Sequence, residues 1–200
     1  MTYLILDTST DQCLIALTQE NRVIAETIFT HGNLLSSSLL PSIQILIESH
    51  IESPKNLSGI ALGTGPGSYT GTRVGAAVAT SLAFALKIPL KSFCSPLAFL
   101  PNQEGAFAFF IPARGDQCYV VSGNIDADAV IQEQAGLYPM EGLDQFQTAD
   151  LLICGSSNAV FKKKCSIPTP NISILCRYLS KQQPSSSGVK LHYLHTALLK

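Results

Sequence analysis

Three short apolar runs separated by polar gaps open the chain, at Tyr3–Leu6, Cys13–Leu17 and Arg22–Phe29. Short runs rich in Ile, Leu and Val are typical of strands, and gaps of a few residues favour hairpin connections. The pattern therefore predicts an antiparallel meander of three strands.

Two longer stretches, Leu34–Ser49 and Thr72–Leu86, place apolar residues at the three- and four-residue spacing of helices. Pro41 lies inside the first stretch and is expected to kink or divide that helix. Leu57–Leu62 and Leu90–Cys94 predict further strands. The resulting order βββαβαβ is that of one half of an actin-like (ribonuclease H-like) fold, in which parallel crossover units follow a meander.

The second hundred residues repeat this plan in a shorter form, with a second meander, a further strand and one helix. We therefore expect an α/β protein of the actin-like (ASKHA) class with two halves, each a mixed sheet flanked by helices. Residues 1–100 form the first half, and residues 101–200 form a smaller, trimmed second half. The predicted elements of the second half are Ala106–Ile111, Gln117–Ser122, Ala129–Gln134, Asp150–Gly155 and Asn171–Ser180.

Composition narrows the class of protein. Of the 200 residues, 46% are hydrophobic and 14% charged, and the net charge of −1 gives no overall attraction to nucleic acid. The six cysteines form no Cys-x-x-Cys pair and lie mostly in or beside apolar runs, which suits buried, reduced thiols. The first residues lack the basic start of a signal peptide, and no apolar run reaches about 18 residues, so we expect a cytoplasmic protein with no membrane association.

The glycine-rich stretch Gly63–Gly75 precedes the second predicted helix, where many α/β proteins bind phosphate. Its spacing fits no standard loop. Thr72 stands where a Walker loop needs Lys, and Ser68 or Thr70 occupies the third glycine position of the dinucleotide fingerprint. Gly67 directly before Ser68 also breaks the hydrolase elbow.

Small residues four apart line one face of the predicted second helix, at Gly71, Gly75, Ala79 and Ala83, and Ala76 widens this strip. Glycine inside a helix costs about 0.5–1 kcal/mol relative to alanine, so these positions call for the close approach of another segment. Two interpretations fit: packing against the domain's own sheet, or docking of another chain.

The sequence contains few candidate catalytic or ligand-binding residues. Asp7–Ser9 places an acid and two hydroxyls at the end of the first strand, where sugar kinases and actin-like ATPases position metal and phosphate; a plain polar turn is the alternative. No His or acid is placed by sequence to activate Ser68. Arg73, at the start of a helix, is expected to pair with a carboxylate or a partner. Two further sets have no apparent ligand or RNA role: His31, His50, His192 and His195, and Lys162–Lys164.

Three classes of function remain in view: a nucleotide-dependent kinase or ATPase, a peptidase-like hydrolase, or a protein that acts by binding another. The missing Lys-bearing loop and metal cluster count against the first class, and the missing elbow and triad count against the second. The bare helical face supports the third.

The stretch Gly65–Gly75 resembles the G-P-G-S-F-T-G-L-R-I-G signature of the TsaB (YeaZ) family. Leu4–Ser9 is similar to the opening strand of that family, and Leu39–Ile43 is similar to its L-L-P-x-I helix. The resemblance covers most of the first hundred residues. The loop part of the signature is Gly65, Pro66, Gly67, Ser68, Tyr69 and Thr70.

The resemblance implies a non-catalytic partner of the TsaD threonylcarbamoyltransferase in tRNA threonylcarbamoyladenosine modification next to the anticodon. It implies a heterodimer with TsaD that a TsaE-type ATPase joins, a homodimer when the chain is alone, and only indirect contact with tRNA. No metal or cofactor is expected within the chain, with ATP or ADP a candidate ligand at a partner interface. The implied interface residues are Leu35, Leu39, Ile43, Leu46, Gly71, Arg73, Gly75, Ala76, Ala79 and Ala83; Asp7, Thr8 and Ser9 are candidates for weak nucleotide binding.

Overall fold

The computed structural model describes residues 1–10, 12–30, 34–113, 115–154, 169–183 and 190–191. The chain divides into two compact units, with Met1–Ser95 the main part of the first and Pro96–Tyr178 the main part of the second. Each unit has its own sheet, so each is described by itself.

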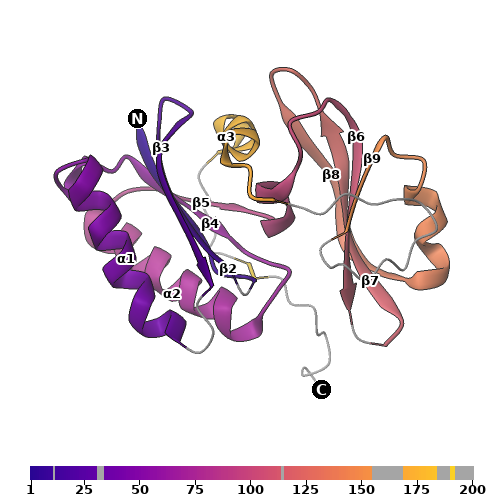
Figure 1. The fold of residues 1–200 in the computed structure, drawn as a ribbon, viewed down its shortest axis with the longest axis horizontal. Coiled ribbons are helices and arrows are strands. Elements are labelled where there is room, and N and C mark those ends of the chain that lie inside the picture. The colour runs from indigo at the N-terminus through magenta and orange to yellow at the C-terminus, as the bar shows by residue number, and fades with distance from the viewer. Residues whose placement is uncertain (11, 31–33, 114, 155–168, 184–189, 192–200) are drawn as a thin grey trace. The chain divides into compact units, whose positions relative to one another are not determined.

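The first unit is built on a five-stranded sheet in the order β3-β2-β1-β4-β5 (Figure 1). β1, β2 and β3 form an antiparallel meander, and β4 and β5 run parallel to β1. The predicted order βββαβαβ is therefore confirmed. The strands are β1 (Thr2–Asp7), β2 (Gln12–Gln19), β3 (Arg22–Thr30), β4 (Gly59–Gly63) and β5 (Leu90–Phe93).

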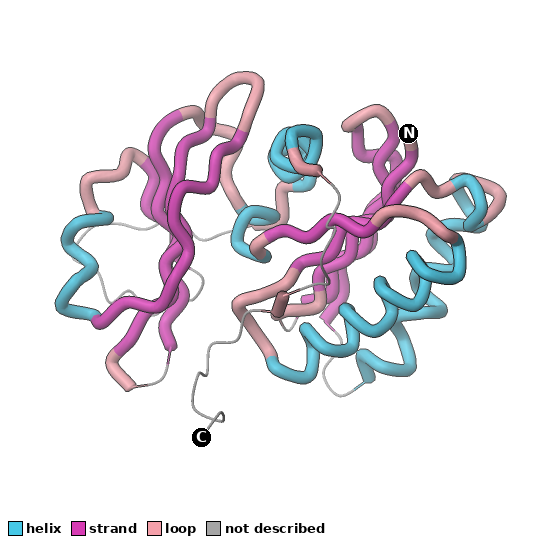
Figure 2. Tube along the Cα trace, turned by 180° about the vertical axis from the view of Figure 1, so that it is seen from behind, coloured by secondary structure: helices cyan, strands magenta, loops and turns pink. Residues whose placement is uncertain are grey.

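Two helices, α1 (Leu35–His50) and α2 (Tyr69–Leu86), cover one face of this sheet and contact each other (Figure 2). Their apolar stripes meet alternate residues of the strands, since side chains of a strand alternate between its two faces. The buried cluster that joins them includes Leu4, Leu6, Ile15, Leu17, Leu39, Ile43, Ile60, Leu62 and Ala79.

Two predictions about these helices need correction, namely the division of the first helix at Pro41 and the start of the second helix at Thr72. Pro41 lies inside α1 and does not divide it. A single missing backbone bond in an otherwise buried helix is tolerated, because packing of the apolar face supplies most of the stability of a helix. α2 begins at Tyr69 rather than at Thr72, because the Ser68 side chain accepts a hydrogen bond from the Gly71 N–H and caps the helix.

The second unit carries a four-stranded sheet in the order β8-β7-β6-β9, which repeats the order β3-β2-β1-β4 of the first. β6, β7 and β8 are antiparallel neighbours, and β9 runs parallel to β6. The predicted second meander is therefore confirmed. The elements are β6 (Gly105–Ala113), β7 (Gln117–Ile125), β8 (Val130–Pro139), β9 (Leu151–Cys154) and α3 (Ile172–Lys181).

Short 3₁₀ helices, which the sequence pattern did not predict, connect these elements. They are η2 (Pro54–Asn56), η3 (Ser95–Phe99) and η4 (Met140–Phe146). η4 follows the second meander at the position that α1 occupies after the first, and its Leu143 and Phe146 are buried in the second core. This replacement of a long helix by a single short one is how the second half is reduced.

The division between the units falls after Ser95 rather than after residue 100. Hydrogen bonds explain the shift. The Asn171 backbone N–H donates to the Ala98 carbonyl oxygen (2.7 Å), and the Asn171 side-chain amide donates to the Leu100 carbonyl oxygen (3.0 Å). These bonds tie residues 98–100 to the second unit. No helix in the described part of either unit is both long enough and apolar enough to cross a membrane.

Candidate functional site

The carboxyl ends of β1 and β4 bring together the two motifs that the sequence singled out. β1 ends in Asp7, followed by Thr8 and Ser9, and its parallel neighbour β4 ends at Gly63 before the glycine turn. The ends of neighbouring parallel strands share one edge of a sheet, where α/β proteins commonly place their sites. All three side chains are buried, with exposed fractions of 2%, 0% and 1% for Asp7, Thr8 and Ser9.

Four glycines spaced four residues apart rest on these three residues. A Cβ atom at Gly63 would collide with the Asp7 carboxyl group, and one at Gly67 would collide with the Ser9 carbonyl oxygen. At Gly71 a Cβ would strike the Thr8 carbonyl oxygen, and at Gly75 it would strike Thr8 Oγ1. The glycines are therefore required because one segment of this chain lies directly on another.

Hydrogen bonds join the same segments. The Thr8 hydroxyl donates to the Gly71 carbonyl oxygen (2.7 Å), and the Ser68 N–H donates to the Ser9 carbonyl oxygen (2.6 Å). On the other side of the turn, the Gly65 N–H donates to Ser95 Oγ (2.9 Å), and the Ser95 N–H donates to the Gly65 carbonyl oxygen (2.8 Å). The signature loop is thus held from both sides by hydrogen bonds to Thr8, Ser9 and Ser95.

The electrostatics of Asp7 follow from its burial. Desolvation raises the pKa of Asp7 above its ordinary value of 3.8, although the Ser9 N–H and the nearby hydroxyls of Ser9 and Ser95 act to lower it. Asp7 Oδ1 accepts from the Ser9 N–H (2.8 Å), as the polar-turn interpretation expects. Asp7 Oδ2 and Ser9 Oγ have no hydrogen-bond partner among the residues that the structure describes.

The same site contains two buried thiols. Burial, with the charge of Asp7 as a smaller cause, raises the pKa of Cys13 and of Cys94 to about 12. A thiol with such a pKa is a poor nucleophile at neutral pH, because the thiolate is the reactive form. The arrangement is suited to fixing the geometry of the loop, and its ionisable groups are shielded from solvent.

The interface that the resemblance implied needs correction for most of its residues. Leu35, Leu39, Ile43 and Leu46 are buried in the chain's own core, with exposed fractions of 6% or less. Gly71, Gly75, Ala79 and Ala83 are buried as well, because this face of α2 packs against Thr8 and the sheet. The small residues therefore serve internal packing, the first of the two interpretations that their spacing allowed.

Arg73 and Ala76 differ from these eight residues. Arg73 is exposed, and its guanidinium lies over the Tyr69 ring at 3.9 Å from the ring centre, whereas Ala76 is half-buried. A cation held on an aromatic face needs no carboxylate to fix its direction. The expected pairing of Arg73 with a carboxylate or a partner stays a prediction.

The outer face of the two helices carries large apolar side chains that the sequence analysis did not select. Leu40 and Ile45 of α1 are 50% and 66% exposed, and Tyr69 and Phe84 of α2 are 51% and 86% exposed. We call these four residues the outer helix face. A usable signal was present in the sequence, since Leu40, Ile45 and Phe84 lie off the stripes of both helices that face the core.

The remaining candidates are the histidines and the lysine run. His50 Nδ1 lies 2.9 Å from the Leu46 carbonyl oxygen of its own helix. The other three histidines and Lys162–Lys164 fall outside the described residues. Within the part of the chain that the structure describes, no three His, Cys, Asp or Glu side chains gather as metal ligands.

Similarity to known proteins identifies the family of this chain. Residues 32–197 match the sequence model of the family described as TsaD, tRNA N6-adenosine threonylcarbamoyltransferase. The protein TsaB of Bacillus subtilis, a tRNA threonylcarbamoyladenosine biosynthesis protein, is 36% identical over 122 residues, 60% of this chain and 53% of the relative. The solved structure of YeaZ from Pseudomonas aeruginosa is 30% identical with a TM-score of 0.62, covering 70% of this chain and 68% of that one. The chain belongs to the TsaB (YeaZ) family.

A TsaB protein of Haemophilus influenzae supports this placement over a longer stretch. It is 28% identical over 184 residues, which cover 82% of this chain and 75% of the relative. The match to the Bacillus subtilis TsaB, by contrast, spans about half the length of that relative. Together with the repeated sheet order of the two units, membership in the TsaB family confirms the predicted actin-like (ASKHA) fold.

Proposed function

We propose that this chain is a non-catalytic subunit of the machinery that makes threonylcarbamoyladenosine in tRNA, and that it acts by binding a TsaD-type threonylcarbamoyltransferase. Its TsaB relatives are named as biosynthesis proteins of this modification. Family membership supports the pathway, and the surface of the first unit supports the mode of action.

The observation that carries the proposal is the outer helix face. Four large apolar side chains are half-exposed or more on two adjacent helices, and the inner faces of the same helices already pack on the sheet. Full burial of a large apolar side chain contributes about 1.5–3 kcal/mol, so covering these four provides a substantial driving force for association. Large apolar side chains that lie exposed on two adjacent helices are candidates for contact with another protein.

The partner's fold suits this face. The chain itself matches the TsaD family over most of its length, so a TsaD-type transferase is built on the same plan and carries helices equivalent to α1 and α2. Two pairs of helices can then pack face to face as a bundle, with side chains of one pair filling the grooves of the other. The same geometry would allow two copies of this chain to pair when the transferase is absent.

The closed state of the Asp7 site supports the non-catalytic part of the proposal. Catalytic groups must reach the reacting atoms, whereas Asp7, Thr8 and Ser9 are at most 2% exposed beneath Gly63, Gly67 and Gly71. A nucleotide phosphate would contact Asp7 only after the backbone at Gly63, which lies against its carboxyl group, moved away. ATP or ADP at a partner interface, and a TsaE-type ATPase as a third subunit, remain part of the proposal.

The test is co-expression with the TsaD homologue of the same organism, followed by size-exclusion chromatography. We expect a heterocomplex with the unchanged chain and its loss with Phe84→Asp or Ile45→Asp, because each places a charge in an apolar contact. Ile131→Asp is the matched control, since Ile131 of β8 is also exposed (51%) but lies in the second unit. Circular dichroism should show that all three variants are folded. A complex that survives both helix substitutions would reject this interface.

A second measurement separates the scaffold from a kinase, ATPase or hydrolase. In a reconstituted threonylcarbamoylation assay, Asp7→Asn should retain activity if it remains folded, because the scaffold requires only the shape of the first unit. An enzyme that used Asp7 for phosphate or metal chemistry would lose activity with this variant. That loss, with the complex intact, would reject the non-catalytic role.

A further inference from the structure

A cavity of about 250 Å³ lies on the sheet of the second unit, beside η4. It is hollow because the side chains beneath it are small. Ala106 of β6 and Ala149 line it and are partly exposed, and Ser122 of β7 is paired with Gln134 of β8, so short side chains leave open space beside η4. Phe146 of η4 forms a wall and is held edge-on to the Tyr138 ring, with 4.9 Å between ring centres.

The polar side chains of the cavity are a carboxylate, two amides and two hydroxyls. Glu133 on β8 has no hydrogen-bond or ion-pair partner within the described ranges, so its charge is uncompensated by neighbours there. Three of the other groups form local hydrogen bonds. Tyr138 donates to Gln134 Oε1 (3.3 Å), and Gln145 Nε2 donates to the Gly142 carbonyl oxygen (2.9 Å). The Thr148 hydroxyl donates to the Gln145 carbonyl oxygen (3.4 Å).

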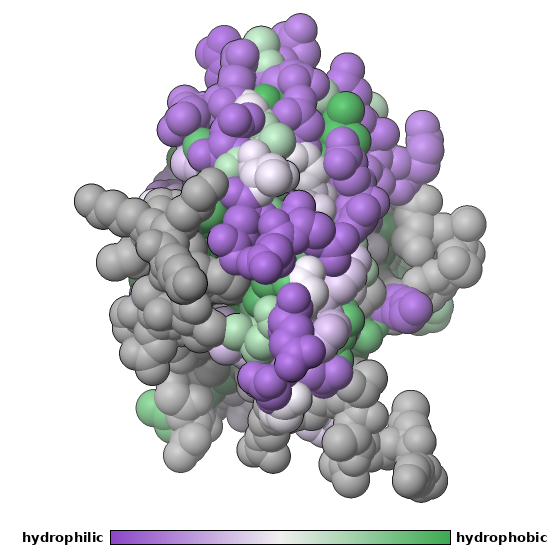
Figure 3. Space-filling model, turned by 90° about the vertical axis from the view of Figure 1, so that its right-hand side faces the viewer, coloured by the Kyte–Doolittle hydropathy of each residue, from purple (hydrophilic) through white to green (hydrophobic). Residues whose placement is uncertain are grey.

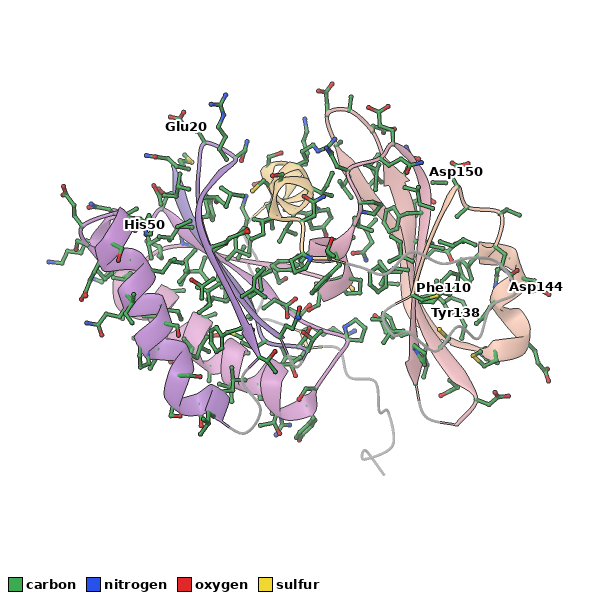
Figure 4. All side chains as sticks on the ribbon, in the orientation of Figure 1. Glu20, His50, Phe110, Tyr138, Asp144 and Asp150 are labelled. Carbon is green, nitrogen blue, oxygen red and sulfur yellow. The ribbon has the colours of Figure 1, made fainter. Side chains whose placement is uncertain are left out.

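The surroundings of the cavity are acidic. Residues 96–154 contain eight acidic side chains and a single arginine, whereas the net charge of the whole chain is only −1. The described acids are exposed; Asp144, next to the lining residue Gln145, points outward (Figure 4), whereas Asp150 Oδ2 accepts a hydrogen bond from the Ala106 N–H (2.9 Å). Figure 3, which views the molecule from this side, shows mainly hydrophilic residues with apolar patches among them.

The one basic side chain described in this unit does not neutralise Glu133. The Arg177 guanidinium donates to the carbonyl oxygens of Asp126 and Ala127 (2.9 Å each) and to Asn102 Oδ1 (2.8 Å). Among the described residues, the charges at the cavity are therefore negative, which favours a cation over an anion.

We propose that this cavity binds a primary ammonium group carried on a short alkyl chain. The methylene groups would lie on Ala106 and Ala149 and against Phe146, and the ammonium would reach Glu133 at the edge. This division matches how a lysine-like group behaves, since its stem gains from apolar contact while its charged head stays near water and a carboxylate. The ligand is either a free polyamine or the lysine side chain of a partner protein. The proposal is independent of the outer helix face.

Isothermal titration at low ionic strength tests this proposal with n-butylamine and spermidine as probes, and with 1-butanol as a neutral probe of the same shape. We expect both amines to bind and butanol to bind at least tenfold more weakly. Glu133→Gln should weaken amine binding about tenfold or more. Asp128→Asn is the matched control, because Asp128 is an exposed acid of the same unit that does not line the cavity, and it should change the dissociation constant less than twofold.

A second arm identifies the source of the ammonium group. Nα-acetyl-lysine amide binding as tightly as butylamine would support a lysine side chain of a partner, and binding of the free amines alone would support a polyamine. Ser122→Leu, which fills the cavity, should abolish binding of every probe in a folded protein. Equal binding of butanol and butylamine, or equal effects of Glu133→Gln and Asp128→Asn, would overturn the proposal.

Discussion

The Thr8 hydroxyl donates a hydrogen bond of 2.7 Å to the Gly71 carbonyl oxygen, in the first turn of α2. This bond joins the residue that follows β1 to the helix that follows β4. The neighbouring Gly75 has no side chain because the same Thr8 hydroxyl occupies that space. The glycine signature and Asp7–Ser9 are therefore two halves of one structural contact.

This contact predicts that Thr8→Ala restores part of the stability that Gly75→Ala removes. Gly75→Ala places a methyl group against Thr8 Oγ1 and should lower the free energy of unfolding by about 1–3 kcal/mol, as overpacking of a well-filled core does. Thr8→Ala removes that oxygen and leaves the Cβ of residue 8 at an ordinary 3.4 Å, so the double variant should be more stable than additivity predicts. Urea unfolding of the four proteins measures this coupling.

Gly71→Ala is the matched control for that cycle. Its new methyl group would meet the Thr8 backbone carbonyl oxygen, which no substitution at position 8 removes. Thr8→Ala should therefore not rescue Gly71→Ala. Equal rescue at positions 71 and 75 would show that the loss of stability arises from the helix itself rather than from contact with Thr8.

Ser68 is predicted to matter through its cap. Its side chain accepts a hydrogen bond from the Gly71 N–H (3.1 Å), and removal of such a cap costs about 1 kcal/mol. Ser68→Ala should lower the midpoint of thermal unfolding accordingly. Ser68→Asp should retain most of the stability, since a carboxylate accepts the same bond and favours a helix N-terminus. A larger loss for Asp than for Ala would contradict the capping role.

Asp7 predicts a pH dependence with a defined sign. Its pKa is raised in the folded state, so the unfolded chain loses this proton first as pH rises above the ordinary value of 3.8. The contribution of Asp7 to stability is complete below that pH and is lost as pH rises through the folded pKa, by about 1.4 kcal/mol for each unit of the shift. Asp7→Asn keeps an acceptor for the Ser9 N–H and does not titrate.

The stability of Asp7→Asn relative to the unchanged chain should therefore increase with pH. Urea unfolding of both proteins in steps from pH 3.5 to neutrality measures this difference, and other titrating groups cancel in the comparison. A difference that stays constant across the range would show that Asp7 ionises as it does in the unfolded chain.

The buried thiols should be unreactive until the first unit opens. Burial raises the pKa of Cys13 and Cys94 to about 12, so the thiolate is scarce at pH 8. A disulfide reagent should label these residues at the unfolding rate in buffer and within seconds in concentrated urea. Cys165 lies outside the described residues, and its substitution leaves fewer thiols to distinguish in the labelling experiment. Fast labelling of Cys94 in the folded protein would contradict the closed site.

Sequence periodicity predicted much of the fold because each of the two long helices has one buried side, and the inner strands, such as β2 and β4, are buried along most of their length. The alternating and continuous apolar runs located both meanders, and the helical spacing of Leu35, Leu39 and Ile43 located α1. η4 was missed because a 3₁₀ helix of seven residues is too short to show a period. The start of α2 was missed because a cap is a single side-chain bond.

The candidate site was harder to predict for a physical reason. A stripe of small residues shows that some backbone or side chain approaches closely, but its spacing is the same whether the neighbour belongs to the same chain or to another. Gly75 meets Thr8, 67 positions earlier, and no local pattern records a contact across that separation. The helical spacing in the sequence does indicate that Ile45 and Phe84 lie off the buried stripes of their helices, and both residues are exposed.

The distance along the chain between Thr8 and Gly71 also has a kinetic consequence. Their bond spans 63 residues, so closing this long loop costs conformational entropy before the contact contributes any stability. We therefore expect the bond to form late, after β1 and β4 have paired. Interactions that are absent from the transition state act mainly on the unfolding rate. Thr8 and the two glycines of α2 that contact it would then set how long a completed first unit persists, and so how long its outer helix face stays available for binding.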